Sequence, residues 1–255
     1  MPEVSSYALS AIAIAMALFA LWLLSLRLRD SSIVDIFWGL GFVLIAWITF
    51  AAAGASPRGL LTAGLTTLWG VRLAGYLAWR NIGKGEDPRY VAMRRRHGDR
   101  WPLRSLFIVF GLQGALMWII SLPVQAAIRA PAAIGALDLI GAVLVLTGVL
   151  FEATGDFQLA WFKKDPANRG KVMDRGLWRY TRHPNYFGDF LVWWGLFAIA
   201  LSASAWWTVV SPALMSFLLL RVSGVTLLEK SLRARPGYED YVRRTSAFFP
   251  WPPRA

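Results

Sequence analysis

Apolar runs of about 20 residues, the length that spans a bilayer core as an α-helix, recur along this chain and constrain its fold most. A helix satisfies its own backbone hydrogen bonds, so it is the element expected where no water is present. Hydrophobic residues make up 56% of the 255 residues, more than a soluble domain of this length needs. The sequence therefore predicts an all-α polytopic membrane protein.

Seven transmembrane helices are predicted, within one membrane domain that covers residues 1–255. We expect residues 1–130 to form the substrate-side helices and residues 131–255 the cofactor-binding half. The first run ends in Arg27 and Arg29 with no small-residue cleavage site, so it is predicted to be a mature helix and not a signal peptide. The predicted spans are residues 7–26, 33–53, 60–79, 106–126, 134–153, 186–201 and 206–227.

Basic residues lie almost entirely on one side of these predicted spans. The Lys and Arg residues outside that side are Arg58, Arg72, Arg129 and Arg221. Because basic loops stay in the cytoplasm, we expect the N-terminus outside and the C-terminus inside, in a bacterial inner membrane. The basic residues behind the net charge of +12 are then expected to contact anionic lipid, and no nucleic-acid partner is expected. Cysteine is absent and only His97 and His183 occur, so no disulfide and no metal site is predicted.

The stretch DRGLWRYTRHPNYFGD, residues 174–189, concentrates cationic side chains directly before an apolar run. Pro184 can begin that helix, and a helix start beside basic groups suits a phosphate. A phosphate-rich nucleotide or a sulfonium nucleoside would fit this position, although each charge taken alone is an ordinary topology signal. The candidate cofactor-binding residues in and before the motif are Asp156, Lys163, Lys164, Asn168, Arg175, Arg179, Arg182, His183, Asn185, Tyr186 and Asp189.

Further cofactor candidates follow in the last predicted span and the tail. Arg221 lies inside an apolar run, which is costly unless the side chain is paired, faces water or snorkels, and Glu229 continues its helical face. The tail, which includes Tyr238, is expected to form an amphipathic helix. It either closes the cofactor pocket or only anchors the chain at the interface.

Asp35 is the candidate catalytic acid. It lies near the start of the second predicted span beside Trp38, where desolvation should raise its pKa and keep a proton available. The alternatives are a helix cap and a structural partner of a basic residue.

Trp69, Arg72 and Tyr76 share one face of the third span. Trp38, Trp69 and Arg72 are candidate substrate contacts, and Tyr76 is either a phenol donor or an interfacial aromatic.

Two glycines in the third span, Gly70 and Gly75, are expected to let a neighbouring helix approach closely.

The chain resembles bacterial members of the steroid 5-alpha-reductase-like membrane family, in particular those grouped as DUF1295. The matching motifs are VDIFWG at 34–39, GDFQ at 155–158, the 176–189 part of the arginine motif, Leu228-Glu229 and Pro236-Gly237-Tyr238. The resemblance implies a seven-helix reductase that transfers hydride from NADPH to a lipid-like enone. It places Asp156, Lys163, Asn185, Asp189 and Arg221 at cofactor-contact positions.

The same resemblance makes Asp35 the acid of the substrate-polarising pair. Two positions depart from the family pattern, because Val34 stands where a glutamine is expected and Trp69 where the catalytic tyrosine is expected. Both departures concern the substrate side and leave the cofactor positions matched.

The core at residues 182–186 is also similar to membrane methyltransferases of the isoprenylcysteine and phospholipid type. That similarity implies S-adenosylmethionine, although the glutamate pair of those enzymes is only Glu229-Lys230 here. The favoured prediction is NADPH-dependent reduction of a conjugated carbon–carbon double bond in a steroid, isoprenoid or acyl substrate. A lipid methyltransferase is the alternative, and a non-enzymatic lipid-binding membrane protein is the third.

Overall fold

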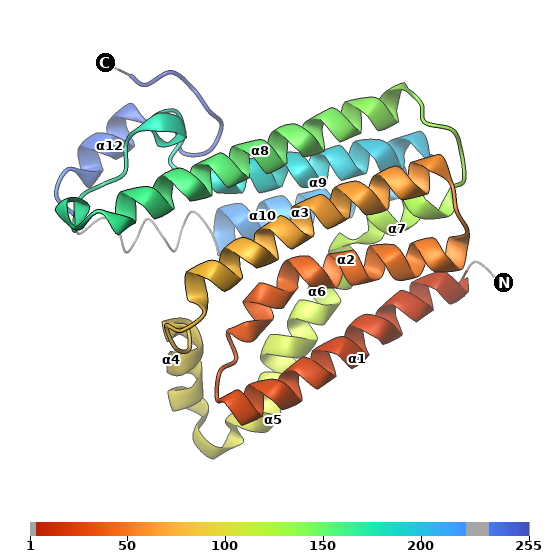
Figure 1. The fold of residues 1–255 in the computed structure, drawn as a ribbon, viewed down its shortest axis with the longest axis horizontal. Coiled ribbons are helices and arrows are strands. Elements are labelled where there is room, and N and C mark those ends of the chain that lie inside the picture. The colour runs from red at the N-terminus through yellow and green to blue at the C-terminus, as the bar shows by residue number, and fades with distance from the viewer. Residues whose placement is uncertain (1–3, 223–234, 255) are drawn as a thin grey trace. The chain divides into compact units, whose positions relative to one another are not determined.

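The computed structural model describes residues 4–222 and 235–254, and these residues form helices and no β-strand (Figure 1). A single isolated bridge pairs Thr181 with Ser246. The chain divides into two compact units, which are described separately below. The first unit is Met1–Asp138 with Ile199–Thr208, and the second is Leu139–Ala198 with Val209–Ala255. The all-α prediction is thus confirmed for the described residues.

The first unit is built on three long neighbouring helices. They are α1 (Val4–Leu28), α2 (Ile33–Ala53) and α3 (Pro57–Asn81), and α2 packs against both of the others (Figure 1). A shorter basic helix, α4 (Pro88–His97), follows, and then 3-10 turn η1 (Gly98–Arg100), α5 (Trp101–Ser105), π-helix η2 (Leu106–Gly111), α6 (Leu112–Ile120) and α7 (Leu122–Arg129).

Close packing between α2 and α3 depends on a pair of glycines. A Cβ added at Gly39 would lie 2.3 Å from the carbonyl oxygen of Gly70, so only hydrogen fits there. This contact confirms the expectation for Gly70. The expectation for Gly75 is wrong, because a Cβ at that position would meet no described atom within 4 Å.

The predicted span at 106–126 is interrupted in the structure. It begins as the π-helical segment η2 and breaks at Ser121, where Pro123 enters the first turn of α7. Proline cannot donate the backbone hydrogen bond that would continue α6, so the helix ends and restarts.

The second unit is organised around α8 (Ala136–Lys164) and α9 (Pro184–Ser202). The first residues of α8 and the last residues of α9 are counted with the first unit. Glycines seven residues apart line their contact. A Cβ at Gly148 would lie 2.5 Å from the Gly188 carbonyl oxygen, and one at Gly195 would lie 2.7 Å from that of Gly141. Small residues at such spacing are typical of tightly packed membrane helices.

The other elements of the second unit are short. They are η3 (Pro166–Asn168), η4 (Gly176–Arg179), α10 (Val210–Phe217), π-helix η6 (Leu218–Val222) and α12 (Tyr238–Arg244). The 3-10 turn η5 (Trp206–Val209) precedes α10.

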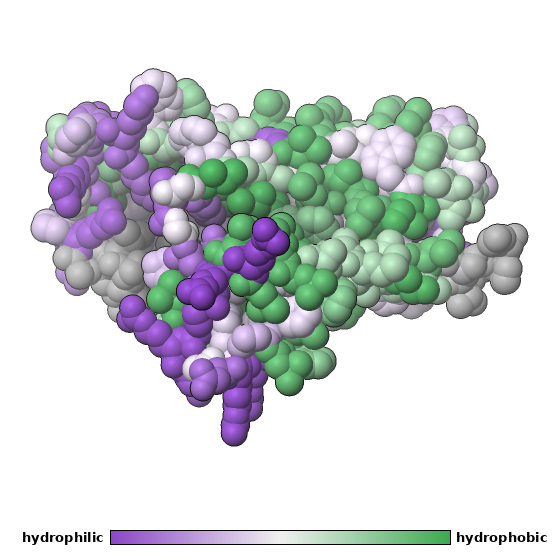
Figure 2. Space-filling view, turned by 60° about the horizontal axis from the view of Figure 1, so that its bottom comes forward, coloured by the Kyte–Doolittle hydropathy of each residue, from purple (hydrophilic) through white to green (hydrophobic). Residues whose placement is uncertain are grey.

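Within residues 4–222 and 235–254, four helical stretches are long and apolar enough to cross a membrane: Ser6–Leu28, Ile33–Ala53, Pro88–Ile120 and Ala136–Lys164. Apolar side chains cover much of the face in Figure 2, while hydrophilic ones of the first unit gather at its α4 end. These features support a multi-pass membrane protein. The count of seven spans and the orientation stay predictions, and the end of the seventh predicted span lies outside the described residues.

Candidate functional site

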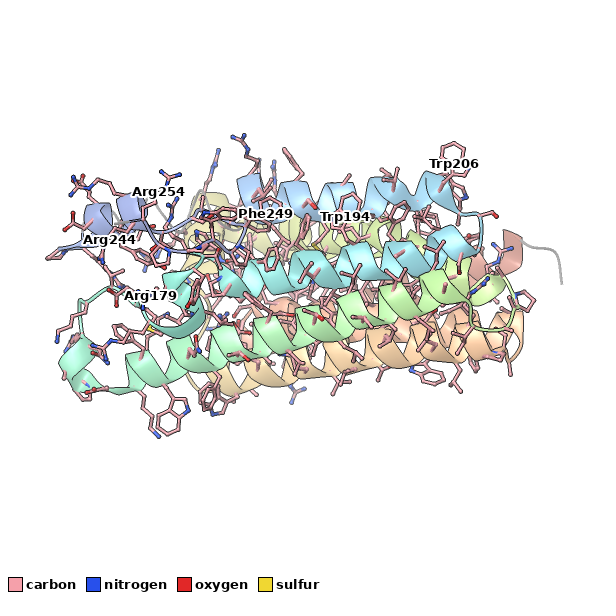
Figure 3. All side chains as sticks on the ribbon, turned by 90° about the horizontal axis from the view of Figure 1, so that it is seen from above. Arg179, Trp194, Trp206, Arg244, Phe249 and Arg254 are labelled. Carbon is pink, nitrogen blue, oxygen red and sulfur yellow. The ribbon has the colours of Figure 1, made fainter. Side chains whose placement is uncertain are left out.

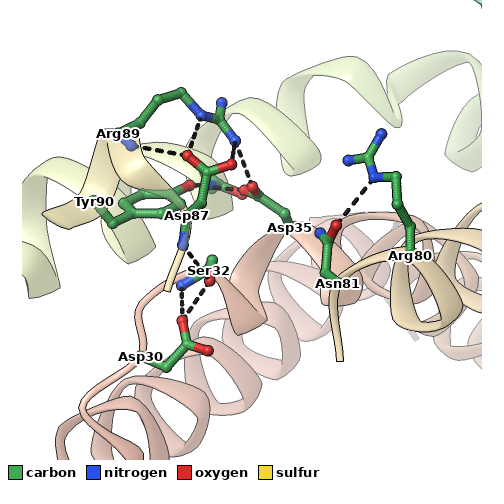
Figure 4. Close-up of polar contacts among 9 residues, drawn as sticks. Asp30, Ser32, Asp35, Arg80, Asn81, Asp87, Arg89 and Tyr90 are labelled. Atoms are coloured by element: carbon green, nitrogen blue, oxygen red, sulfur yellow. Dashed lines mark hydrogen bonds and ion pairs between the residues drawn. The ribbon is translucent and has the colours of Figure 1, made fainter. Parts of the chain in front are cut away.

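A polar cluster of the first unit brings the start of α2 against the start of α4 (Figure 4). The hydroxyl of Tyr90 donates to Oδ1 of Asp35 at 2.7 Å, and Nη2 of Arg89 donates to Oδ2 at 2.7 Å. The side-chain amide of Gln113 donates to the Tyr90 oxygen at 3.2 Å. Tyr90 is only 6% exposed. We call Asp35, Arg89, Tyr90 and Gln113 the Asp35 cluster.

Two acidic residues before α4 hold that helix in place. Asp87 caps it by accepting from the backbone N–H of Arg89 at 2.9 Å, with Pro88 in the first turn. Glu86 accepts from the Ser31 backbone N–H at 2.7 Å and from Arg94 at 2.8 Å. These bonds tie the α3–α4 connection to the turn between α1 and α2.

Both carboxyl groups are held ionised. Burial raises the pKa of Glu86, but the hydrogen bonds from Arg94 and Ser31 outweigh it and lower that pKa below its ordinary value. Burial likewise opposes ionisation of Asp87, and the hydrogen bonds from Arg89 bring its pKa below the ordinary value. The connection is therefore fixed by charge-assisted bonds at neutral pH.

Asp35 does not cap α2, and its partners in the structure are Arg89 and Tyr90. Of the alternative roles for Asp35, the geometry therefore favours that of a structural partner of a basic residue. It adds a buried phenol that the sequence did not point to, because Tyr90 lies in a basic stretch beyond the third predicted span.

Tyr76, the phenol proposed from the sequence, lies on α3. The guanidinium groups of Arg72 and Arg80 each stand 5.6 Å from the centre of its ring. These contacts are cation–π interactions.

The two tryptophans proposed as substrate contacts pack on one ring. Trp69 is fully buried with its ring 5.5 Å from that of Phe42, and the Trp38 ring lies 5.4 Å from Phe42 on an edge-to-face contact. Both are therefore packed in or beside the core of the first unit. Their roles toward a substrate, like that of Arg72, stay predictions.

The arginine motif forms one wall of a cavity of about 630 Å³ in the second unit. We call it the arginine cavity. Arg175 and Arg179 line it from the motif, and Arg244 and Arg254 line it from the C-terminal segment. Figure 3 shows Arg179, Arg244 and Arg254 gathered at the same end of the unit. No ion pair with a described residue neutralises these four arginines, and Asp174 is the acid in the lining.

Hydrogen bonds to the C-terminal segment set the shape of this wall. The Thr181 hydroxyl donates to the Phe248 carbonyl at 2.7 Å, and the Tyr241 hydroxyl donates to the Trp178 carbonyl at 2.6 Å. Nη1 of Arg182 donates to the Thr245 carbonyl at 2.9 Å. Of the two interpretations of the tail, this geometry favours the one in which it closes a pocket.

Four further cofactor candidates lie where α8 meets the start of α9. The side-chain amide of Asn185 donates to Asp156 at 3.2 Å, and the ring of His183 stacks on that of Tyr186 at 5.6 Å. Asp156 and His183 are buried. This group follows directly after the arginine motif in sequence but does not line the arginine cavity.

The remaining candidates are dispersed. Asn168 donates to the Phe162 carbonyl and so caps the end of α8. Lys164 lies 5.0 Å over the ring of Trp161, and Lys163 beside it is exposed. Asp189 is half-buried on α9, Arg221 is exposed on η6, and Tyr238 is buried at the start of α12. Glu229 lies outside the described residues.

Sequence reasoning missed Arg244 and Arg254 as cavity residues, and Tyr90, Arg89 and Gln113 as partners of Asp35. The signal for the two arginines was present, since the tail carries several arginines among aromatic residues.

Comparison with known proteins agrees with the motifs. The family model described as "Protein of unknown function (DUF1295)" matches residues 21–245. The chain is 28% identical to "Uncharacterized protein C594.04c" of Schizosaccharomyces pombe, over 90% of this chain and 75% of that protein. No solved structure matches. Because the family match covers most of the chain, this protein belongs to the DUF1295 family.

Proposed function

We propose that this protein is a membrane-embedded reductase that uses NADPH to reduce a carbon–carbon double bond conjugated to a carbonyl in a lipid-like substrate. The observation that carries the proposal is the arginine cavity, in which Arg175, Arg179, Arg244 and Arg254 surround about 630 Å³ with one acid in the lining. The resemblance of the 155–189 motifs to membrane reductases supports the same cofactor.

The residues of the cavity fit a polyphosphate better than a sulfonium. A guanidinium presents a planar fork of donors that matches phosphate oxygens, and the four in this cavity have no carboxylate partner within residues 4–222 and 235–254. S-adenosylmethionine carries its own positive charge on sulfur, so it gains less from this surplus of cations. Arg175, Arg179, Arg244 and Arg254 would hold the phosphates. NADPH, when bound, supplies the hydride.

The Asp35 cluster offers the proton-bearing group. Asp35 accepts from both Arg89 and Tyr90, which is the behaviour of an ionised carboxylate. The proton of this pair therefore stands on the Tyr90 hydroxyl, and Asp35 and Gln113 position it. A substrate carbonyl oxygen that reaches Tyr90 and replaces Asp35 as the acceptor of its hydroxyl proton would be polarised by that hydrogen bond. Tyr90 thus takes the role that the sequence had suggested for Tyr76.

Ligand-induced stabilisation tests the cofactor. A ligand at a hundred times its dissociation constant adds about 2.7 kcal/mol to the free energy of unfolding, so NADPH should raise the melting temperature of the purified chain. Arg179→Gln should weaken this effect, because it removes one of four cavity cations. Arg95→Gln is the matched control, since Arg95 is exposed on α4 in the other unit. Stabilisation by S-adenosylmethionine alone would overturn the reductase proposal in favour of the methyltransferase.

A further inference from the structure

A second, smaller cavity of about 230 Å³ lies beside α12 and the C-terminal segment. Arg182, Arg243, Arg244 and Arg254 line it, together with Trp251, and its lining holds no acidic residue. It shares Arg244 and Arg254 with the arginine cavity, whereas Arg243 and Trp251 line only the smaller one. We call it the tail cavity.

The charges around the tail cavity leave room for an anion. Nη1 of Arg182 is engaged by the backbone carbonyls of Val242 and Thr245. Arg243 contacts Asp240, but these side chains are 77% and 61% exposed, so water screens their attraction. The cavity is smaller than the roughly 300 Å³ at which pockets for drug-sized ligands begin. A single phosphate group matches both its size and its charge.

Exposed aromatic residues beside the cavity indicate where such a phosphate comes from. Trp251 is 70% exposed and Phe249 is 60% exposed. The Phe249 ring lies 5.8 Å from Phe190 of α9, which in turn lies 5.8 Å from Trp194. Figure 3 shows Phe249 close to Arg244 and Arg254, and Trp194 farther along α9. An aromatic track therefore leads from the cationic cavity along an apolar helix.

This combination is the chemistry of a lipid at the membrane surface. Tryptophan side chains at the interface lie level with the head groups, where arginines attract anionic lipid phosphates. We propose that the tail cavity binds the head-group phosphate of an anionic phospholipid, whose acyl chain runs along Phe249 and α9. The C-terminal segment also lines the arginine cavity, so its packing there would depend on the lipid composition of the membrane.

Native mass spectrometry of the full-length chain tests the site. The protein is delipidated in detergent and mixed with phosphatidylglycerol or with phosphatidylcholine. We expect one phosphatidylglycerol to be retained per chain and phosphatidylcholine to be retained at least about tenfold more weakly. The double variant Arg243→Gln, Trp251→Ala should lose this preference, and Arg95→Gln should keep it. The single variant Arg243→Gln replaces the double variant if the latter does not fold.

Two results would overturn the assignment. Undiminished phosphatidylglycerol retention in the folded variant places the lipid elsewhere. Displacement of the lipid by millimolar inorganic phosphate makes the cavity a site for soluble anions. Stabilisation by NADPH is measured in parallel and should persist in the variant, because neither changed residue lines the arginine cavity. Failure of the lipid site and failure of the cofactor proposal are thus distinguishable.

Discussion

At the scale of single residues, the Tyr90 hydroxyl is the group on which the proposed chemistry depends most. Tyr90→Phe removes that hydroxyl and keeps the ring, so Asp35 and Gln113 lose their shared partner while the packing stays. Turnover should fall on the order of 10²-fold, the effect expected for loss of a positioned acid, and NADPH-induced stabilisation should remain. The measurement is NADPH oxidation with a conjugated enone lipid in mixed micelles. Asp35→Asn should lower turnover similarly, because it removes the charge that orients Tyr90.

Tyr76→Phe is the control for the variants Tyr90→Phe and Asp35→Asn. Its ring lies 5.6 Å from both the Arg72 and the Arg80 guanidinium groups, and cation–π attraction does not need the hydroxyl. Turnover should therefore stay close to that of the wild type. The opposite ranking, with Tyr76→Phe inactive and Tyr90→Phe active, would return the catalytic phenol to α3.

The sequence made Asp35 a candidate but did not predict its partners, for a physical reason. A carboxylate inside an apolar run is conspicuous because its burial is costly. Tyr90 is not, since it follows a loop of Gly, Lys and acidic residues and precedes a cluster of arginines. Its contact with Asp35 joins residues 55 positions apart and exists only because Glu86 and Asp87 fix the start of α4. No local pattern encodes such a contact.

At the scale of helices, the glycine-lined contact between α8 and α9 determines how the second unit packs. Gly148→Ala would place a methyl group 2.5 Å from the Gly188 carbonyl oxygen and 2.9 Å from the Val192 backbone nitrogen. Backbone atoms cannot move aside as a flexible side chain can, so the helices must separate. We expect a loss of about 1–3 kcal/mol in unfolding free energy, measured as a lower melting temperature in detergent.

Gly64→Ala serves as the matched change within α3. A Cβ at Gly64 meets no described atom within 4 Å, and alanine favours helix over glycine. The melting temperature should stay constant or rise slightly. Equal destabilisation by both changes would mean that the close approach at Gly148 does not account for the loss.

Helix boundaries followed from the sequence where the signals were local. The second predicted span, residues 33–53, coincides with α2 because apolar periodicity and the Ser31-Ser32 turn both mark its start. The fourth did not, since the apolar run through 106–126 hides the π-helical segment and the break at Ser121. Pro123 was the available signal for that break. The π-helix has no comparable signature, since such segments are rare and appear mostly as short insertions within α-helices.

At the scale of the whole molecule, Arg58 does not belong with the loop charges from which the orientation is predicted. The predicted topology puts Arg58 in the outer connection between the spans at 33–53 and 60–79, but the structure shows it buried, and its Nε donates to Asp138 at 3.0 Å. Asp138 also accepts from the Ser202 hydroxyl and the Gly135 N–H. This arginine is therefore a structural partner of a buried carboxylate and carries no information on orientation. Without it, the basic bias toward the predicted cytoplasmic side becomes stronger.

That bias makes orientation the sharpest prediction for the intact protein. The chain has no cysteine, so single cysteines can be introduced without a background of native thiols. Ala55 is exposed between α2 and α3, and Lys84 is exposed between α3 and α4. In intact cells a membrane-impermeant maleimide should label Ala55→Cys and should reach Lys84→Cys only after permeabilisation. α3 would then cross the membrane, although it is less apolar than the four stretches that qualify by composition alone. Labelling of both sites from outside would place the Asp35 cluster away from the cytoplasm, where a reductase has no supply of NADPH, and would contradict the proposed function as well as the topology.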